Sequence, residues 1–245
     1  MQTREYAAVA FYTGFKQELP PVINAVFPYK LFWNQLMGDA ENYICGLAHE
    51  SFHAFQGARI PQRFAQAERA CRLESEYPWQ QPENVRGWTA EADLLIYGVK
   101  SATDKQAAQW AQQFLQQRCE RREQAGLSDE YVRYERQREW LEGLAKYAEL
   151  KLGLEAQSLE TYDPDDHIKQ IQNFDHYSHC QTYFKKQVDE VRRRVQSDGE
   201  SRFYYTGLLQ AVLLDRLVPD WEINIFEDDV YLDQMLSTKV CAQES

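Results

Sequence analysis

The stretch Leu47–Gly57, LAHESFHAFQG, contains two histidines and a glutamate in the order H-E-x-x-H. It belongs to a segment, from about Glu41 to Gln56, that is apolar nearly all round, which is typical of a buried helix ending near Gly57. Histidines four residues apart lie on one face of a helix, so His49 and His53 can reach the same metal ion. The stretch therefore supports two interpretations: core histidines with hydrogen-bond partners, or a zinc site.

Glu50 directly follows the first histidine of the motif. On a helix it would flank a metal held by the histidines without binding it. In that place it can hold a water molecule at the metal and take its proton. A catalytic zinc site needs a third protein ligand and an open position, so the H-E-x-x-H motif alone is incomplete.

A candidate for the third ligand lies in the segment EWLEGLAKYAE, residues 139–149. Glu142 is followed by Gly143 and then by Ala145, small residues that allow a second helix to approach closely. A ligand bridge between two helices requires such an approach. Glu139, one turn earlier, is the alternative third ligand.

The same glutamate also has an interpretation without a metal. Glu142 and Lys146 form an i,i+4 pair, which is common on exposed helix faces and contributes only a few tenths of a kcal/mol. Glu135, Glu142 and Glu149 are spaced by seven, which is also the pattern of an acidic stripe. Composition alone leaves both interpretations open.

The composition of the 245-residue chain, with 44% hydrophobic and 27% charged residues, is that of a soluble globular protein. The formal net charge of −11 argues against binding to nucleic acid. Five cysteines without a C-x-x-C pair argue against a disulfide framework. No apolar run could span a bilayer, and the N-terminus lacks the layout of a signal peptide. We therefore expect a cytoplasmic protein, exported only if a signal precedes this chain.

Helical periodicity dominates the chain, and no linker or repeat divides it. Residues 1–36 are the exception, because their aromatic and β-branched clusters between prolines predict one or two short strands. We expect a single mainly α (α+β) domain over residues 1–245. The predicted helices lie at about 41–56, 88–99, 107–114, 128–152, 167–196 and 202–217.

Several helix ends have local signals. Ser128 is a good N-cap, and Gly153 predicts the end of the helix that begins there. The sequence Ser197-Asp198-Gly199 predicts a break, and Pro219 ends the last apolar helix.

HESFH followed by WLEGLAKY resembles the gluzincin branch of the zincin metallopeptidases, which includes the zinc aminopeptidases. That branch pairs H-E-x-x-H with a downstream helix in a W-L-x-E-G-x-A-x-Y context. The resemblance implies a zincin-like catalytic domain with one zinc ion held by His49, His53 and Glu142. It also implies that Glu50 is the general base.

A third segment, Phe203–Leu209 with the sequence FYYTGLL, resembles the Y-x-x-G segment of the same family. The resemblance makes Tyr204, three residues before Gly207, the donor that stabilises the tetrahedral oxyanion, with Tyr205 as the alternative. A phenol can serve this role because it donates a hydrogen bond without carrying charge. Packing of an aromatic helix start on the core is the other interpretation.

Two differences from the family are clear. The two zinc-binding segments are much farther apart in this chain, so residues 58–127 are interpreted as a helical insertion that can shape the cleft or bind a protein partner. The G-x-M-E-N strand that binds a substrate N-terminus is missing. Gly38–Asn42, GDAEN, looks similar to it but lies too close to His49 to form that strand. Specificity for a free N-terminus is therefore unsupported.

The predicted function is a zinc metallopeptidase that acts on a peptide or protein substrate. The alternatives are a helical interaction protein with a structural zinc or without turnover, and a zinc hydrolase of a non-peptide amide or ester. Glu50 favours an enzyme, because a purely structural site has no need of it. His176 and His179 form a rival pair, but they lie in a polar segment without a carboxylate set, which is typical of surface histidines.

Overall fold

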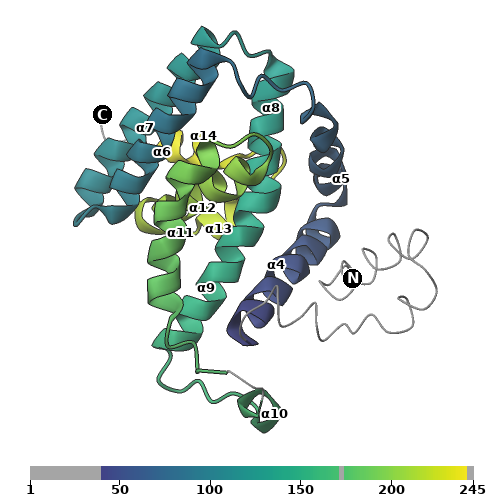
Figure 1. The fold of residues 1–245 in the computed structure, drawn as a ribbon, viewed down its shortest axis with the longest axis vertical. Helices are drawn as coiled ribbons and strands as arrows, with labels where there is room; N and C mark the ends of the chain where they lie inside the picture. The colour runs from purple at the N-terminus through teal and green to yellow at the C-terminus, as the bar shows by residue number, and fades with distance from the viewer. Residues whose placement is uncertain (1–39, 171–173, 242–245) are drawn as a thin grey trace, which may run out of the picture. The chain divides into compact units, whose positions relative to one another are not determined.

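The computed structural model describes residues 40–170 and 174–241, and it shows the predicted mainly α fold (Figure 1). No strand occurs within these residues. The strands predicted in residues 1–36 lie outside the described part of the chain. The elements are α4 (Ala40–Arg59), α5 (Pro61–Ala70), η1 (Cys71–Leu73), α6 (Pro82–Lys100), α7 (Asp104–Gln124), α8 (Asp129–Arg138), η2 (Glu139–Gly143), α9 (Leu144–Ser158), α10 (Asp166–Lys169), α11 (Cys180–Val195), α12 (Ser201–Leu217), α13 (Trp221–Asn224) and α14 (Leu232–Cys241).

Local signals place several of these helix ends correctly. Ser128 is the N-cap of α8, and its side chain accepts a hydrogen bond from the Tyr131 amide at 3.4 Å. The break after α11 contains Gly199, whose φ of 90° lies outside the helical region. α12 ends at Leu217, two residues before Pro219.

Two helix ends predicted at glycines are wrong. α4 continues through Gly57 to Arg59. α9 continues through Gly153 to Ser158, and a Cβ on Gly153 would lie 2.7 Å from the sulfur of Cys180. Gly153 is therefore a packing glycine, which leaves room for a neighbouring side chain instead of ending the helix.

The single helix predicted over residues 167–196 is also wrong. The structure has the short α10 and then α11, which begins only at Cys180. Between them His176 and Tyr177 both have a φ of 59°, a left-handed conformation that interrupts a right-handed helix.

The described residues pack into two compact units. The first unit contains the chain up to Phe55 together with Ala148–Tyr183, and the second contains Gln56–Tyr147 together with the chain from Phe184 onward. The boundaries fall inside α4, α9 and α11. A single catalytic domain over residues 1–245 stays a prediction.

In the first unit, α4 and α9 run antiparallel. His49 of α4 contacts Glu149 of α9, and four residues earlier on α4, Cys45 lies beside Gly153, four residues later on α9. Glu41, at the start of α4, accepts a hydrogen bond from the Asp175 amide at 2.5 Å. The N-terminal turn of α4 is thereby tied to the loop before α11.

In the second unit, α12 is the central helix. It contacts η2, α14, α6 and α7, while α6 and α7 pack along each other (Figure 1). Trp88 and Leu95 of α6, Phe114 of α7, and Phe203 and Leu208 of α12 are fully buried in this core. The proposed insertion, residues 58–127, is helical as predicted, because it comprises α5, η1, α6 and α7.

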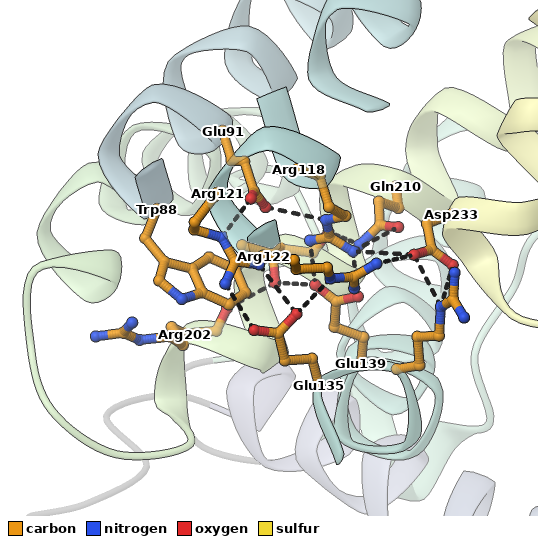
Figure 2. Close-up of polar contacts among 12 residues, drawn as sticks. Trp88, Glu91, Arg118, Arg121, Arg122, Glu135, Glu139, Arg202, Gln210 and Asp233 are labelled. Atoms are coloured by element: carbon orange, nitrogen blue, oxygen red, sulfur yellow. Dashed lines mark hydrogen bonds and ion pairs between the residues drawn. The ribbon is translucent and has the colours of Figure 1, made fainter. Parts of the chain in front are cut away.

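A network of buried arginines and carboxylates crosses the core of the second unit (Figure 2). Arg118 donates to both carboxylate oxygens of Glu139 at 2.7 Å and to Glu91 at 2.9 Å. Arg121 lies between Glu91 and Glu135, at 2.5 and 2.7 Å. Burial alone would lower the pKa of Arg118, but Glu139 and Glu91 outweigh it and raise the pKa. Both arginines are therefore charged and paired with buried carboxylates.

The C-terminal helix belongs to the same network. Asp233 of α14 accepts hydrogen bonds from Arg122 at 2.9 Å and from Arg136 at 3.0 Å. Removing one partner of a buried pair typically costs about 3–5 kcal/mol, because the other charge is left uncompensated. The network thus fixes the relative positions of α6, α7, α8, η2 and α14.

Candidate metal centre

His49 and His53 lie one turn apart on α4, as the sequence predicts. Their ring centroids are 4.9 Å apart with the rings nearly perpendicular, and His49 is buried while His53 is half-buried. The helix itself is less buried than its apolar composition predicts, because Phe55 is 48% exposed. The two imidazoles are therefore close enough to bind one metal ion together.

Glu149 orients the first histidine. Its Oε2 lies 3.2 Å from Nδ1 of His49, and both side chains are 8% exposed. A carboxylate next to Nδ1 favours the tautomer that carries its proton there, which would leave the lone pair of Nε2 for a metal. In the sequence, Glu149 stands out only as a member of an acidic stripe with Glu135 and Glu142. Its spacing of two helical turns from Glu142 was the available signal.

We predict that Glu149→Leu weakens zinc binding by about 10–100-fold, the usual effect of losing a partner that orients a ligand. Competition with a chromophoric chelator would measure the affinity. Glu155→Leu, an exposed position on the same helix, is the matched control and should leave it unchanged. Equal zinc affinity in the two variants would contradict the role of Glu149.

Glu139 and Glu142 lie in different surroundings. Both belong to η2, a π-helical turn inserted between α8 and α9. Glu139 is held by Arg118 on both oxygens and accepts a hydrogen bond from Thr206 at 2.7 Å. Its carboxylate is thus committed to the buried network, which makes it a poor metal ligand. π-Helical turns occur often at functional sites, and this one gives the two glutamates separate partners.

Three side chains form a group that could hold a metal ion: His49, His53 and Glu142. One potential ligand atom from each lies within 4.8 Å of the other two. Among the described residues, no other group of three histidine, cysteine or acidic side chains brings its potential ligand atoms together in this way. Two imidazole nitrogens and one carboxylate oxygen are a donor set that fits zinc, and the set is largely buried.

Gly143 allows a close approach, but its partner is α12 and not the predicted one, the helix that carries His49 and His53. A Cβ on Gly143 would lie 2.5 Å from the Cα of Gly207, and a Cβ on Gly207 would lie 2.7 Å from the carbonyl oxygen of Glu139. The glycines of the W-L-E-G and Y-Y-T-G segments therefore touch each other. This crossing places Tyr204, one turn before Gly207, beside Glu142, which directly precedes Gly143.

Gly207→Ala should lower the free energy of unfolding by about 3 kcal/mol or more, because the added methyl group meets backbone atoms that cannot rotate away. Urea unfolding would measure the change. Gly57→Ala is the control, since a Cβ there meets only the Phe64 ring at 3.6 Å. That variant should be neutral or slightly more stable, because alanine favours helix. Equal stability of the two variants would contradict the contact.

Gln56, the residue after Phe55 on α4, supports the π-helical turn. Its side-chain amide donates to the carbonyl oxygens of Trp140 at 2.9 Å and Leu141 at 3.3 Å. Gln56 is completely buried. A π-helical turn shifts the regular hydrogen-bond pattern, and this side chain provides a donor for the carbonyls beside Glu142.

Tyr204 is the tyrosine that reaches the candidate ligand. Burial raises the pKa of its phenol far above the ordinary value, and the hydrogen-bonded carboxylate of Glu142 raises it further. The phenol is therefore protonated and able to donate. The ring of Tyr205 instead lies under the guanidinium of Arg194, at 5.4 Å.

The remaining candidates are placed as follows. Glu50 is half-buried on α4, one residue after His49. His176 is exposed, and the side chain of His179 is 84% exposed and lies 3.2 Å from Asp175. This pair does not join a metal-binding group within the described residues.

Each helix in the described part of the chain is too short or too polar to span a bilayer. Comparisons of the chain with protein-family models, with curated proteins and with solved structures find no match.

Proposed function

We propose that this protein is a zinc metallopeptidase of the gluzincin type, with His49, His53 and Glu142 as the ligands of one zinc ion. The proposal is carried by one observation: the three residues singled out from two distant sequence segments have ligand atoms within 4.8 Å of one another. Glu149 beside His49 adds a partner of the kind that orients metal ligands.

The roles of the protein groups follow from their chemistry. Zinc, when bound, supplies Lewis acidity toward a peptide carbonyl and lowers the pKa of water. Glu50, beside the ligand His49, would accept the proton of the attacking water and deliver it to the leaving amine. Tyr204 would donate a hydrogen bond to the oxygen that gains negative charge.

The experiment that tests this function is elemental analysis of the purified protein, coupled to a broad peptide-cleavage screen with and without chelator. We expect one zinc per chain and a cleavage activity that chelation abolishes and zinc restores. Stoichiometric zinc without cleavage would favour the structural-zinc interaction protein. Zinc-dependent hydrolysis of amides or esters but not of peptides would favour the non-peptide hydrolase. Absence of zinc would reject both zinc hydrolases and the structural-zinc protein, and would favour an interaction protein without turnover.

Tyr204→Phe is expected to lower kcat by about 100–1000-fold, corresponding to about 2.7–4 kcal/mol for one oxyanion donor. KM and zinc content should change little, because the lost hydrogen bond strengthens only as charge develops. Steady-state kinetics with a peptide found in the screen would measure both constants.

Tyr205→Phe is the matched control, since its ring lies under Arg194. If only Tyr205→Phe reduces kcat, the oxyanion donor is Tyr205. If neither does, the resemblance over residues 203–209 reflects packing alone.

A further inference from the structure

Arg138 holds the carboxylate of Glu142 from the last residue of α8. Its Nη2 donates to Oε1 of Glu142 at 2.9 Å. The two residues are only 5% and 7% exposed, so solvent competes little for this contact. With Oε1 engaged by the guanidinium, Oε2 is the oxygen expected to face a metal ion.

A second carboxylate holds Arg138 in turn. The same Nη2 lies 2.6 Å from Oε2 of Glu200, and Nη1 donates to the carbonyl of Ala67 at 3.3 Å. Tyr134, one turn earlier on α8, donates to the other oxygen of Glu200 at 2.9 Å. A guanidinium is planar with fixed donor directions, so partners from three segments leave it one orientation.

Glu200 also balances the charge of Arg138. A lone guanidinium beside a metal ligand would oppose a bound cation by Coulomb repulsion, most strongly where solvent is excluded. The carboxylate of Glu200 offsets that charge. Arg138 can therefore orient Glu142 without a large electrostatic penalty for a cation.

We propose that Arg138 is a positioning residue for Glu142, and that the pair of Arg138 and Glu200 sets the zinc affinity of the site. The inference rests on the proposed function, because it takes Glu142 as a zinc ligand. Partners that orient metal ligands typically contribute about 10–100-fold to metal affinity. An orienting role and a purely electrostatic role predict opposite changes in zinc affinity when Arg138 is removed. Loss of a positive charge alone would tighten zinc binding, whereas loss of orientation would weaken it.

The test measures zinc affinity by chelator competition in Arg138→Gln and in the double variant Arg138→Gln/Glu200→Gln, which keeps the net charge of the wild type. We expect about 10–100-fold weaker zinc binding in both. Arg136→Gln is the control, because Arg136 lies on the same helix but bonds Asp233. Its affinity should equal that of the wild type. The absorption spectrum of bound cobalt(II) should change in the Arg138 variants and not in the control, since it reports ligand geometry.

The outcomes separate this inference from the proposed function. If folded Arg138→Gln binds zinc as tightly as the wild type or more tightly, the role of Arg138 is rejected while the zinc site stands. If Arg138→Gln does not fold, the zinc affinity of the charge-balanced double variant decides. An affinity equal to or higher than that of the wild type would then reject the role of Arg138. If the wild type binds no zinc, both proposals are rejected.

Discussion

Glu142→Gln is expected to bring the zinc content of the purified protein close to zero, whereas Glu139→Gln is expected to keep it stoichiometric. A neutral amide is a poor zinc ligand, and zinc sites lose most of their affinity with one ligand. Glu139 is instead held by Arg118 and Thr206. Its loss should lower the free energy of unfolding by about 3 kcal/mol, since it leaves a buried guanidinium undercompensated.

Elemental analysis and urea unfolding of the two variants would measure both effects. His53→Ala should behave like Glu142→Gln and lose zinc. If Glu139→Gln loses zinc while folded and Glu142→Gln keeps it, the third ligand is Glu139. If all three variants keep stoichiometric zinc, the metal binds elsewhere, and His176 with His179 is the first pair to replace.

Glu50→Gln has the second large expected effect. Glutamine preserves the shape and hydrogen bonding of the side chain but cannot accept a proton from water. Zinc content should therefore stay at one per chain, while kcat falls by about 100–10,000-fold, the range for losing a general base. Cleavage kinetics and elemental analysis on the same preparation would show both results.

Glu68→Gln is the matched control for Glu50→Gln. It makes the same chemical change at an exposed position on α5 and should leave kcat unchanged. An unchanged kcat in Glu50→Gln would reject Glu50 as the base. Loss of zinc in that variant would instead give Glu50 a role in metal binding.

Helix class and most helix positions could be predicted from the sequence, because apolar periodicity and caps such as Ser128 are local signals. The errors arise where a residue serves a distant contact. Gly153 has the local signature of a helix end, yet its missing side chain accommodates Cys180. His176 and Tyr177 carry no sequence signal for their positive φ, so the break before α11 could not be foreseen.

The candidate site follows the same division. The H-E-x-x-H motif and Glu142 could be identified because spacing and neighbouring residues define them. The choice between Glu139 and Glu142 could not be made, since it depends on Arg118, which lies 21 residues earlier in the chain. Glu149 was missed for a similar reason, because its ion pair with His49 joins two helices that are far apart in the sequence. Arg138 lies four residues before Glu142, so their ion pair has a local signal in the i,i+4 spacing.

The π-helical turn at Glu139–Gly143 has a consequence for insertions and deletions. Its wider hydrogen-bonded loop contains one residue more than an α-helical turn would. That turn covers about the same rotation as an α-helical turn, so deleting one residue within it would restore an uninterrupted α-helix and keep the two flanking segments in phase. Deleting one residue between Gly143 and Glu149 would instead rotate Glu149 by about 100° around the helix relative to Glu142. Homologous chains with this architecture should therefore tolerate a one-residue gap at this turn before they tolerate one in the helix that follows it.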